Sequence, residues 1–303
     1  MSEHSRRKGA HLDLCATDDV AFQHKTTLLD EVQLVHDALP EVDIDAIDLS
    51  TKVAGHDVRL PICISAMTGG VDRAETINRD LASVAEEAGI AFGFGSMRPL
   101  LEDGNRKGYF VRDVAPTAVV LGNIGGVQAA ASSTAQIEDM VGATGLSALC
   151  VHLNPAQEVI QGGGDTDFRG VVDAIARLVS ELSVPIVVKE TGAGLSRQVG
   201  LRLHDAGVRH VDISGAGGTS WVAVETLRAR AKTKALGELF WDWGIPTAAS
   251  VAQVADLAFD TVIATGGIRN GLDIARVMAL GADAGGMARA FLMAHNQGGR
   301  DAV

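Results

Sequence analysis

The sequence predicts an α/β protein folded as a (β/α)8 TIM barrel with an N-terminal extension. Eight short apolar runs follow one another, and helix-like segments lie between most of them. The runs are rich in Val, Ile and Leu with little alternation, which is typical of strands buried on both faces. The 303 residues, 47% of them apolar, suffice for one such barrel. A doubly wound sheet is the alternative that this pattern leaves open.

The apolar runs place the strands of the barrel. They span residues 60–65, 90–94, 118–122, 148–153, 184–189, 209–214, 245–250 and 261–265. Residues 72–88, 168–182 and 272–280 carry apolar stripes at helical spacing and are predicted as helices. Gly89 and Gly281 follow two of these helices, where a left-handed cap ends a helix.

Three parts of the chain are distinguished. Residues 1–55 form the N-terminal extension, with a helix expected around residues 27–36. Residues 56–292 form the barrel, and residues 293–303 are expected to be a flexible tail because their Gly-rich sequence continues no pattern.

The composition excludes several classes of function. Lys and Arg number 26 against 38 Asp and Glu, so the net charge is −12, which argues against binding to nucleic acid or an anionic membrane. We expect no transmembrane segment and a cytoplasmic protein, because the chain has neither a long apolar run nor an apolar signal core. The three cysteines form no Cys-x-x-Cys pair, so neither a disulfide nor a zinc site is expected.

Glycine makes up 35 of the 303 residues and clusters directly after the predicted strands. Such loops include 65–70, 93–98, 122–126, 189–192, 214–219 and 265–271. Glycine permits close backbone approach, and bare N–H groups near helix starts bind phosphate, so a large, flat, anionic ligand is predicted at this end of the barrel. The dinucleotide-binding fingerprint Gly-x-Gly-x-x-Gly is not complete anywhere, because Arg98, Arg197 and Ser220 stand where the third glycine belongs.

FMN fits this pattern better than a dinucleotide. Residues 215–219 and 266–267 match the phosphate site that barrels form after strands 7 and 8 and in the loop before them. Lys189 ends the fifth predicted strand and could place a cation near the electron-rich ring. Asn123 directly follows the third predicted strand and could hydrogen-bond the edge of the ring.

Several sequence blocks point to one family. They are Arg7-Lys8-x-x-His11, Ser65-Ala66-Met67-Thr68-Gly69-Gly70, His152-Leu153-Asn154-x-x-Gln157-Glu158, the run from Asp212 to Trp221, the run from Asp242 to Thr247, and Gly266-Gly267-Ile268-Arg269-Asn270-Gly271. With these blocks the chain resembles the type 2, FMN-dependent isopentenyl diphosphate isomerases over about residues 7–292. The last block also resembles α-hydroxy acid oxidases and supports only the cofactor. The first and third blocks are what indicate the isomerase.

The resemblance implies an enzyme that interconverts isopentenyl and dimethylallyl diphosphate by a 1,3-allylic proton shift. It implies reduced FMN as acid and base, Mg²⁺, NADPH as reductant, and a homo-oligomer, a tetramer or octamer. The FMN contacts would be Ala66, Met67, Thr68, Ser96, Asn123, Lys189, Ser214, Thr219, Gly266, Gly267, Ala288 and Arg289. The diphosphate contacts, some of them from the N-terminal extension, would be Arg7, Lys8, His11, Ser96 and Arg98.

The resemblance also implies which groups lie at the reacting carbons. His152 and Asn154 would be near the substrate, with His152 and Gln157 as the catalytic residues, and Glu158 would bind the metal. Gly162-Gly163-Gly164-Asp165 departs from the usual Pro-Glu-Gly-Asp of the family, so the loop after Glu158 is expected to be looser.

Two other functions remain open at this point. The block at Gly266 also suits an FMN-dependent oxidoreductase of the α-hydroxy acid oxidase type, which would need a general-base histidine and paired arginines for a carboxylate. The altered loop at Gly162 also suits a non-catalytic, flavin-binding homologue.

Overall fold

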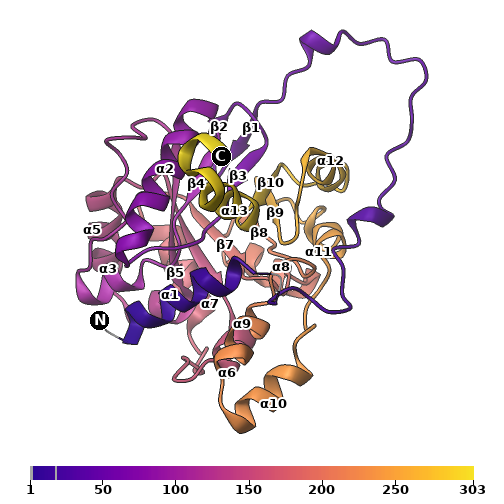
Figure 1. Cartoon of the computed structure of the whole chain (residues 1–303). Coiled ribbons are helices and arrows are strands. Elements are labelled where there is room, and N and C mark those ends of the chain that lie inside the picture. Colours follow the sequence, from indigo (N-terminus) through magenta and orange to yellow (C-terminus); the bar gives the residue numbers. More distant parts are fainter. Residues whose placement is uncertain (1–2, 18) are drawn as a thin grey trace.

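The computed structural model describes residues 3–17 and 19–303, apart from the side chains of residues 3–8 and Ala231. Eight parallel strands close into a barrel in the order β10-β3-β4-β5-β6-β7-β8-β9, which confirms the predicted fold class (Figure 1). The strands are β3 (Ile62–Ile64), β4 (Ala91–Gly93), β5 (Val119–Gly125), β6 (Ala148–Leu153), β7 (Ile186–Glu190), β8 (His210–Asp212), β9 (Thr261–Thr265) and β10 (Ala284–Met287).

Helices surround the barrel and α1 lies in front of it (Figure 1). The helices are α1 (Glu3–Cys15), α2 (Asp72–Ala88), α3 (Arg98–Asp103), α4 (Gly126–Ala131), α5 (Thr134–Thr144), α6 (Pro155–Ile160), α7 (Val171–Glu181), α8 (Arg197–Asp205), α9 (Trp221–Arg228), α10 (Ala231–Leu239), α11 (Thr247–Val254), α12 (Gly271–Ala279) and α13 (Arg289–Gly298), with 3-10 turns η1 (Leu29–Glu31), η2 (Ile44–Ala46) and η3 (Gly299–Ala302). Among residues 3–17 and 19–303, no helix is both long and apolar enough to cross a membrane.

The barrel strands alternate between two apolar layers, which explains their unbroken hydrophobic sequences. On β5, Val120 belongs to the layer between strands and helices, whereas Val119 and Leu121 belong to the inner layer. On β7, Val188 lies in the layer between strands and helices and Val187 lies in the inner layer. Because side chains alternate along a strand, the next inward position after each inner apolar residue lies nearer the carboxyl end of the barrel.

A short hairpin closes the amino end of the barrel. β1 (Thr51–Val53) pairs antiparallel with β2 (His56–Val58). Val53 and Val58 are buried and pack in the inner cluster with Cys63 and Cys150, both of which are free cysteines. The hairpin therefore covers the apolar interior at the amino end of the barrel.

One predicted strand is wrong and one barrel strand was not predicted. Residues 245–250 enter helix α11 instead of forming a strand, because Pro246, with a φ of −51°, precedes the first helical residue and fixes a helix-compatible backbone. The eighth strand is β10, whose Gly285 pairs with Ile62 of β3 and Ala264 of β9. Its sequence has no β-branched residue, so only barrel closure identifies it as a strand.

The two ends of the chain also differ from expectation. Of the helix expected around residues 27–36, only the 3-10 turn η1 forms, whereas α1 was not predicted. The expected flexible tail, residues 293–303, forms the end of α13 and η3 instead. It is bonded to α2, where His295 Nε2 lies 2.9 Å from Asp80 Oδ2 and Arg300 Nε lies 3.1 Å from Ser83 Oγ.

Candidate active site

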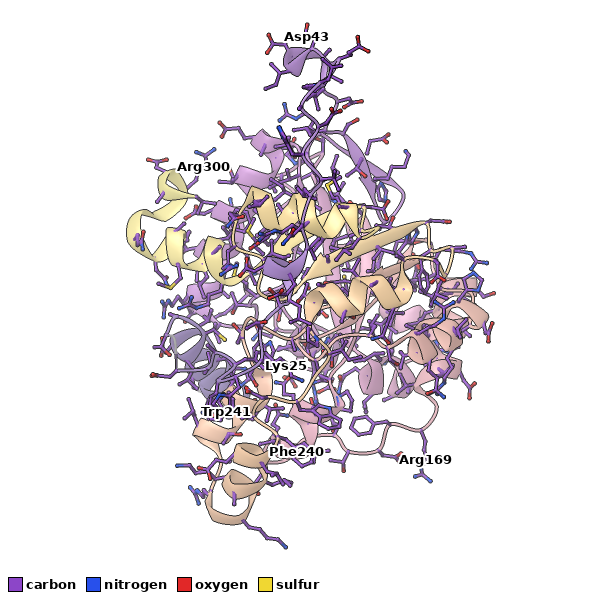
Figure 2. All side chains as sticks on the ribbon, turned by 90° about the vertical axis from the view of Figure 1, so that its right-hand side faces the viewer. Lys25, Asp43, Arg169, Phe240, Trp241 and Arg300 are labelled. Carbon is purple, nitrogen blue, oxygen red and sulfur yellow. The ribbon has the colours of Figure 1, made fainter. Side chains whose placement is uncertain are left out.

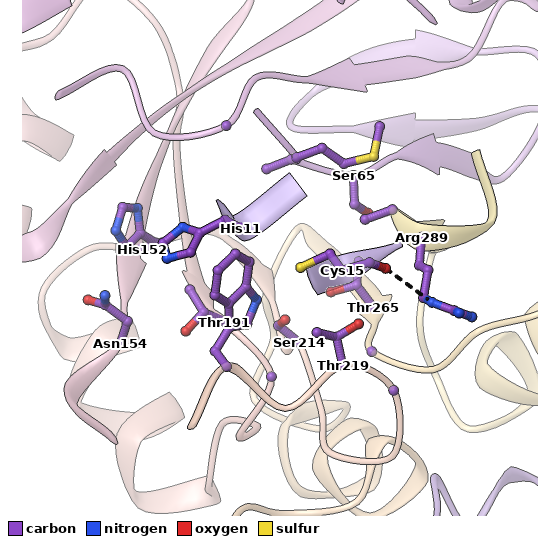
Figure 3. A pocket seen from close by; sticks show the side chains of 18 of the residues that line it. His11, Cys15, Ser65, His152, Asn154, Thr191, Ser214, Thr219, Thr265 and Arg289 are labelled. Carbon is purple, nitrogen blue, oxygen red and sulfur yellow. Dashed lines mark hydrogen bonds between the residues drawn. The ribbon is translucent and has the colours of Figure 1, made fainter. Parts of the chain in front are cut away.

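A cavity of about 510 Å³ opens at the carboxyl end of the barrel. Its lining includes loops that follow the barrel strands and residues of α1, α6 and α13. Figure 3 shows His152 and Asn154 on one side of this cavity and Arg289 on the other. All the predicted site residues except two line the cavity: His11, Ala66, Met67, Thr68, Ser96, Arg98, Asn123, His152, Asn154, Gln157, Glu158, Lys189, Ser214, Thr219, Gly266, Gly267, Ala288 and Arg289. Arg7 and Lys8 fall on α1, and their side chains lie outside the described residues.

Polar side chains form the floor of the cavity at the inward strand positions above the apolar inner layer. Those that line the cavity are Ser65, Asn123, His152, Lys189 and Thr265, and Asp212 holds the equivalent position on β8 without lining it. Their strands alternate in and out, so residues two positions apart face the same way. The sequence therefore changes from apolar to polar at one height around the barrel.

The floor residues are held by specific hydrogen bonds. Asn123 Nδ2 donates to Phe94 O at 3.1 Å, which leaves Asn123 Oδ1 as the acceptor for His152 Nδ1 at 2.8 Å. His152 Nδ1 therefore carries a proton, and a neutral His152 ring has its lone pair on Nε2.

A cation is fixed in the same layer. Lys189 Nζ lies 3.6 Å from Asp212 Oδ2 and donates to Glu190 O at 2.5 Å. Asp212 is 5% exposed, and its Oδ1 accepts from Thr265 Oγ1 at 2.6 Å. This buried pair places a positive charge under the cavity and fixes its position.

Helix α6 supplies a second polar group beside the floor. Asn154 Nδ2 donates to Glu158 Oε1 at 2.8 Å and to Gln157 Oε1 at 3.2 Å. Gln157 Nε2 in turn lies 3.4 Å from Glu225 Oε1. These contacts keep the amide of Gln157 and the carboxylate of Glu158 at the wall of the cavity.

The loop after Glu158 is tied to the site at Asp165. The backbone N–H of Asp165 donates to Glu158 Oε2 at 2.8 Å. Asp165 Oδ2 also accepts from Arg98 Nη1 at 2.6 Å. Gly162 and Gly163 face open space, so the altered residues of this loop make no contact that a side chain would disturb.

Glu225 connects several of these residues and was not predicted as part of the site. It is 2% exposed, and its carboxylate lies 2.8 Å from His11 Nε2 and 2.6 Å from Arg228 Nη1. Burial raises its pKa, but the bonds from His11 and Gln157 and the nearby Arg228 lower the pKa more, so the net shift is downward. A single acid among the apolar residues of α9 was the signal in the sequence.

Glycines bring the loops after β8 and β9 together. A Cβ on Gly218 would overlap the backbone N of Gly267, and one on Gly266 would overlap Gly215 O. The backbone of Gly266 has a φ of +98°, which favours glycine. In chain order, these loops follow the sixth and seventh strands of the barrel, and Ala288 follows the eighth. The strand at residues 261–265 is therefore the seventh and not, as expected, the eighth.

The residues present fit FMN. Among the described residues, Ser65 Oγ is the buried side-chain polar atom without a hydrogen-bond partner, and it lines the cavity. It lies beside Gly286, whose missing side chain leaves this part of the floor clear. A ligand with polar atoms along its edge would supply the missing partner.

The described residues hold no preformed metal centre. No group of three or more His, Cys, Asp or Glu side chains is placed to hold an ion in the described part of the chain. Glu158 offers one carboxylate, so a bound Mg²⁺ would complete its coordination with water and substrate oxygens.

Comparison with known proteins gives the family of the chain. Residues 2–103 and 151–303 match the FMN-dependent dehydrogenase family. An isopentenyl-diphosphate delta-isomerase of Methanothermobacter thermautotrophicus is 44% identical, over 99% of this chain and 84% of that protein. Those of Synechococcus sp. and Halobacterium salinarum are 46% and 48% identical, over 96% and 94% of this chain and 85% and 81% of their own lengths. The chain therefore belongs to the isopentenyl-diphosphate delta-isomerases within the FMN-dependent dehydrogenase family.

Proposed function

We propose that the protein interconverts isopentenyl diphosphate and dimethylallyl diphosphate by moving a proton between two allylic carbons. The observation that carries this proposal is the polar wall formed by His152, Asn154, Gln157 and Glu158 beside a glycine-lined cavity. Relatives that bear the isomerase name share 42–48% of their residues with the chain.

The cofactor and the chain divide the chemistry. Reduced FMN supplies, when bound, an acid for the alkene and an electron-rich face beside a tertiary cation. Gln157 and His152 position the reacting carbons and hold protons next to them, since their side chains are fixed by Asn154 and Asn123. Lys189, held beside Asp212, would place a positive charge near the electron-rich ring. The chain needs no nucleophile for this reaction.

The diphosphate is held by positive charge and a metal. It carries about three negative charges near neutral pH, so a protein of net charge −12 needs a local cluster of cations. We assign Arg7, Lys8, His11, Ser96 and Arg98 to the diphosphate and Glu158 to Mg²⁺. Arg98 pairs with Glu102 and Asp165 through Nε and Nη1. Because a guanidinium has five N–H donors, it still has donors for the diphosphate.

The remaining parts of the proposal concern the setting of the enzyme. NADPH is the proposed reductant of the flavin, the proposed location is the cytoplasm, and the proposed assembly is a homo-oligomer. Because NADPH is the proposed reductant, the test that follows supplies it.

Proton NMR under nitrogen tests the proposal. The purified protein is supplied with FMN, Mg²⁺, NADPH and isopentenyl diphosphate. We expect conversion to the dimethylallyl isomer that disappears when the reductant is omitted. A yellow protein that produces no isomer would contradict the isomerase and support a non-catalytic, flavin-binding role.

An oxidase of the α-hydroxy acid type is disfavoured by the arginines at the cavity. Arg98 pairs with two carboxylates, and Arg289 Nε donates to Cys15 O at 3.2 Å. Arg98 begins helix α3 and Arg289 begins helix α13, so they do not form a pair facing one carboxylate. Anaerobic reduction of the flavin by lactate or glycolate would reverse this conclusion.

A further inference from the structure

An acidic and apolar segment projects from the barrel. We define the arm as residues 33–50, all of which are exposed. Figure 1 shows it as a long loop that leaves the body of the molecule, and Figure 2 places Asp43 at its tip. Its large apolar side chains are at least 46% exposed: Leu34, Val35, Leu39, Val42, Ile44, Ile47 and Leu49. An apolar surface of this kind normally lies against a partner.

The charge of the arm has one sign. It contains five carboxylates and neither Lys nor Arg: Asp37, Glu41, Asp43, Asp45 and Asp48. Asp37 Oδ1 and Asp48 Oδ1 accept backbone N–H groups two residues ahead at 2.9 and 2.8 Å, so local turns order the arm. Glu41 and Asp45 form no ion pair with any described residue.

Helix α10 presents the complementary surface, which we call the α10 face. Arg230, Lys232 and Lys234 are exposed and form no ion pair within the described part of the chain, and Glu238 is the acid of this helix. Large apolar side chains continue the surface, with exposed fractions from 37% to 77%: Leu236, Leu239, Phe240 and Trp243. The rings of Phe240 and Trp243 meet edge to face at 5.4 Å. Aromatic side chains of this kind are enriched at protein interfaces.

We propose that the arm of one copy of the protein docks on the α10 face of a second copy. The carboxylates of the arm would meet the three cations, and its apolar side chains would cover those around Trp243. Figures 1 and 2 both show the arm and α10 at opposite ends of the molecule, so one chain cannot join its own two surfaces.

This interface gives the homo-oligomer of the proposed function a geometry, and it rests on that function only for the expectation that copies associate. Each copy offers one arm and one α10 face, so docking closes either a mutual pair or a ring. Association is measured without substrate, so the interface can fail while the isomerase activity stands, and the reverse.

Charge reversal with mixing tests the interface. One variant carries Glu41→Lys and Asp45→Lys in the arm, and the other carries Lys232→Glu and Lys234→Glu on α10. The acids on α10 fall in its first turn, where helices favour negative charge. The control variant carries Asp139→Lys and Asp205→Lys, two exposed acids on α5 and α8. Sedimentation velocity is run on each FMN-loaded protein and on mixtures.

We expect the wild type and the control to associate and each reversed variant to sediment as a monomer. An equal mixture of the two reversed variants should associate again, because each reversed arm then meets a face of opposite charge. Three results would overturn the proposal: a monomeric wild type at every concentration, association that neither reversal changes, or reversed variants that stay monomeric when mixed. Unchanged FMN binding shows that each variant is folded.

Discussion

Glu225 shows how one residue joins the N-terminal helix to the polar wall of the cavity. Its buried carboxylate contacts His11 of α1, Gln157 of α6 and Arg228 of its own helix. A buried carboxylate is stable only when cations and donors surround it. The position of His11 and the orientation of Gln157 therefore depend on the same group.

At this scale the roles of Gln157 and Lys189 can be separated. We expect Gln157→Ala to lower isomerisation by about 10²-fold or more, as for loss of a group that assists proton transfer, while FMN stays bound. Lys189→Ala should weaken FMN binding, because it leaves the buried Asp212 without its cation. Fluorescence titration of FMN and NMR turnover measure the two effects. Equal loss of FMN in both variants would contradict the division of roles.

Glu190 predicts a pH dependence of stability. Burial raises the pKa of its carboxyl to about 7, although backbone N–H groups of Thr191 and Ala193 oppose the shift. A group with a raised pKa in the folded state contributes most below its ordinary pKa and loses that contribution as the pH rises through the folded value.

We therefore expect the free energy of unfolding of the wild type, relative to Glu190→Gln, to fall by about 3 kcal/mol between pH 4.5 and 7. Above pH 7 the difference should level off. Urea denaturation of both proteins without FMN provides the measurement. A difference that is constant over this range would show that Glu190 has an ordinary pKa.

At the scale of elements, the loops after β8 and β9 act together as one surface. Gly218 and Gly267 lie so close that no side chain fits between the loops. Glycines let backbone N–H groups approach phosphate oxygens closely, so we expect these loops to contribute to phosphate binding.

Gly218→Ala tests this contact. The added Cβ would overlap the backbone of Gly267 and force the loops apart, so FMN affinity should fall roughly tenfold, or about 1.4 kcal/mol. Gly142→Ala is the matched control, because a Cβ at Gly142 of α5 meets open space. The control should keep FMN affinity and gain up to about 1 kcal/mol of stability. Similar FMN affinity in both variants would show that the loops can separate without cost.

At the scale of the whole molecule, a hairpin packs on one end of the barrel and a large cavity opens at the other. The β1–β2 hairpin fills the amino end with Val53, Ala54 and Val58, and the polar floor begins above this apolar layer. This arrangement makes the hairpin part of the core although it lies outside the eight-stranded sheet.

Val53→Ala should lower the free energy of unfolding by about 2 kcal/mol, since it removes buried methyl groups from a fully covered site. Leu201→Ala on α8, at a side chain 46% exposed, is the control and should change stability little. Urea denaturation compares the two. A smaller effect at Val53 than at Leu201 would mean that the hairpin is not part of the cooperative core.

Local sequence predicted most of the barrel because its strands are buried on both faces. Seven of the eight predicted strands coincide with β3 to β9, and the helix over 72–88 matches α2. The strand predicted over residues 245–250 was wrong because an apolar run of strand length also fits the start of a helix. Strand β10 was not predicted because Gly285 and Gly286 have no preference for strands.

The sequence by itself determined that a glycine-rich, polar mouth tops an apolar barrel, because residue type and spacing alone set which positions can be buried. It also brought together the motif residues from His152 to Glu158. Only the tertiary structure decided that Glu225 joins this set, that Ser65 lacks a partner, and that the arm and the α10 face lie at opposite ends. Contacts between distant segments arise from barrel closure and packing, and no local pattern encodes them.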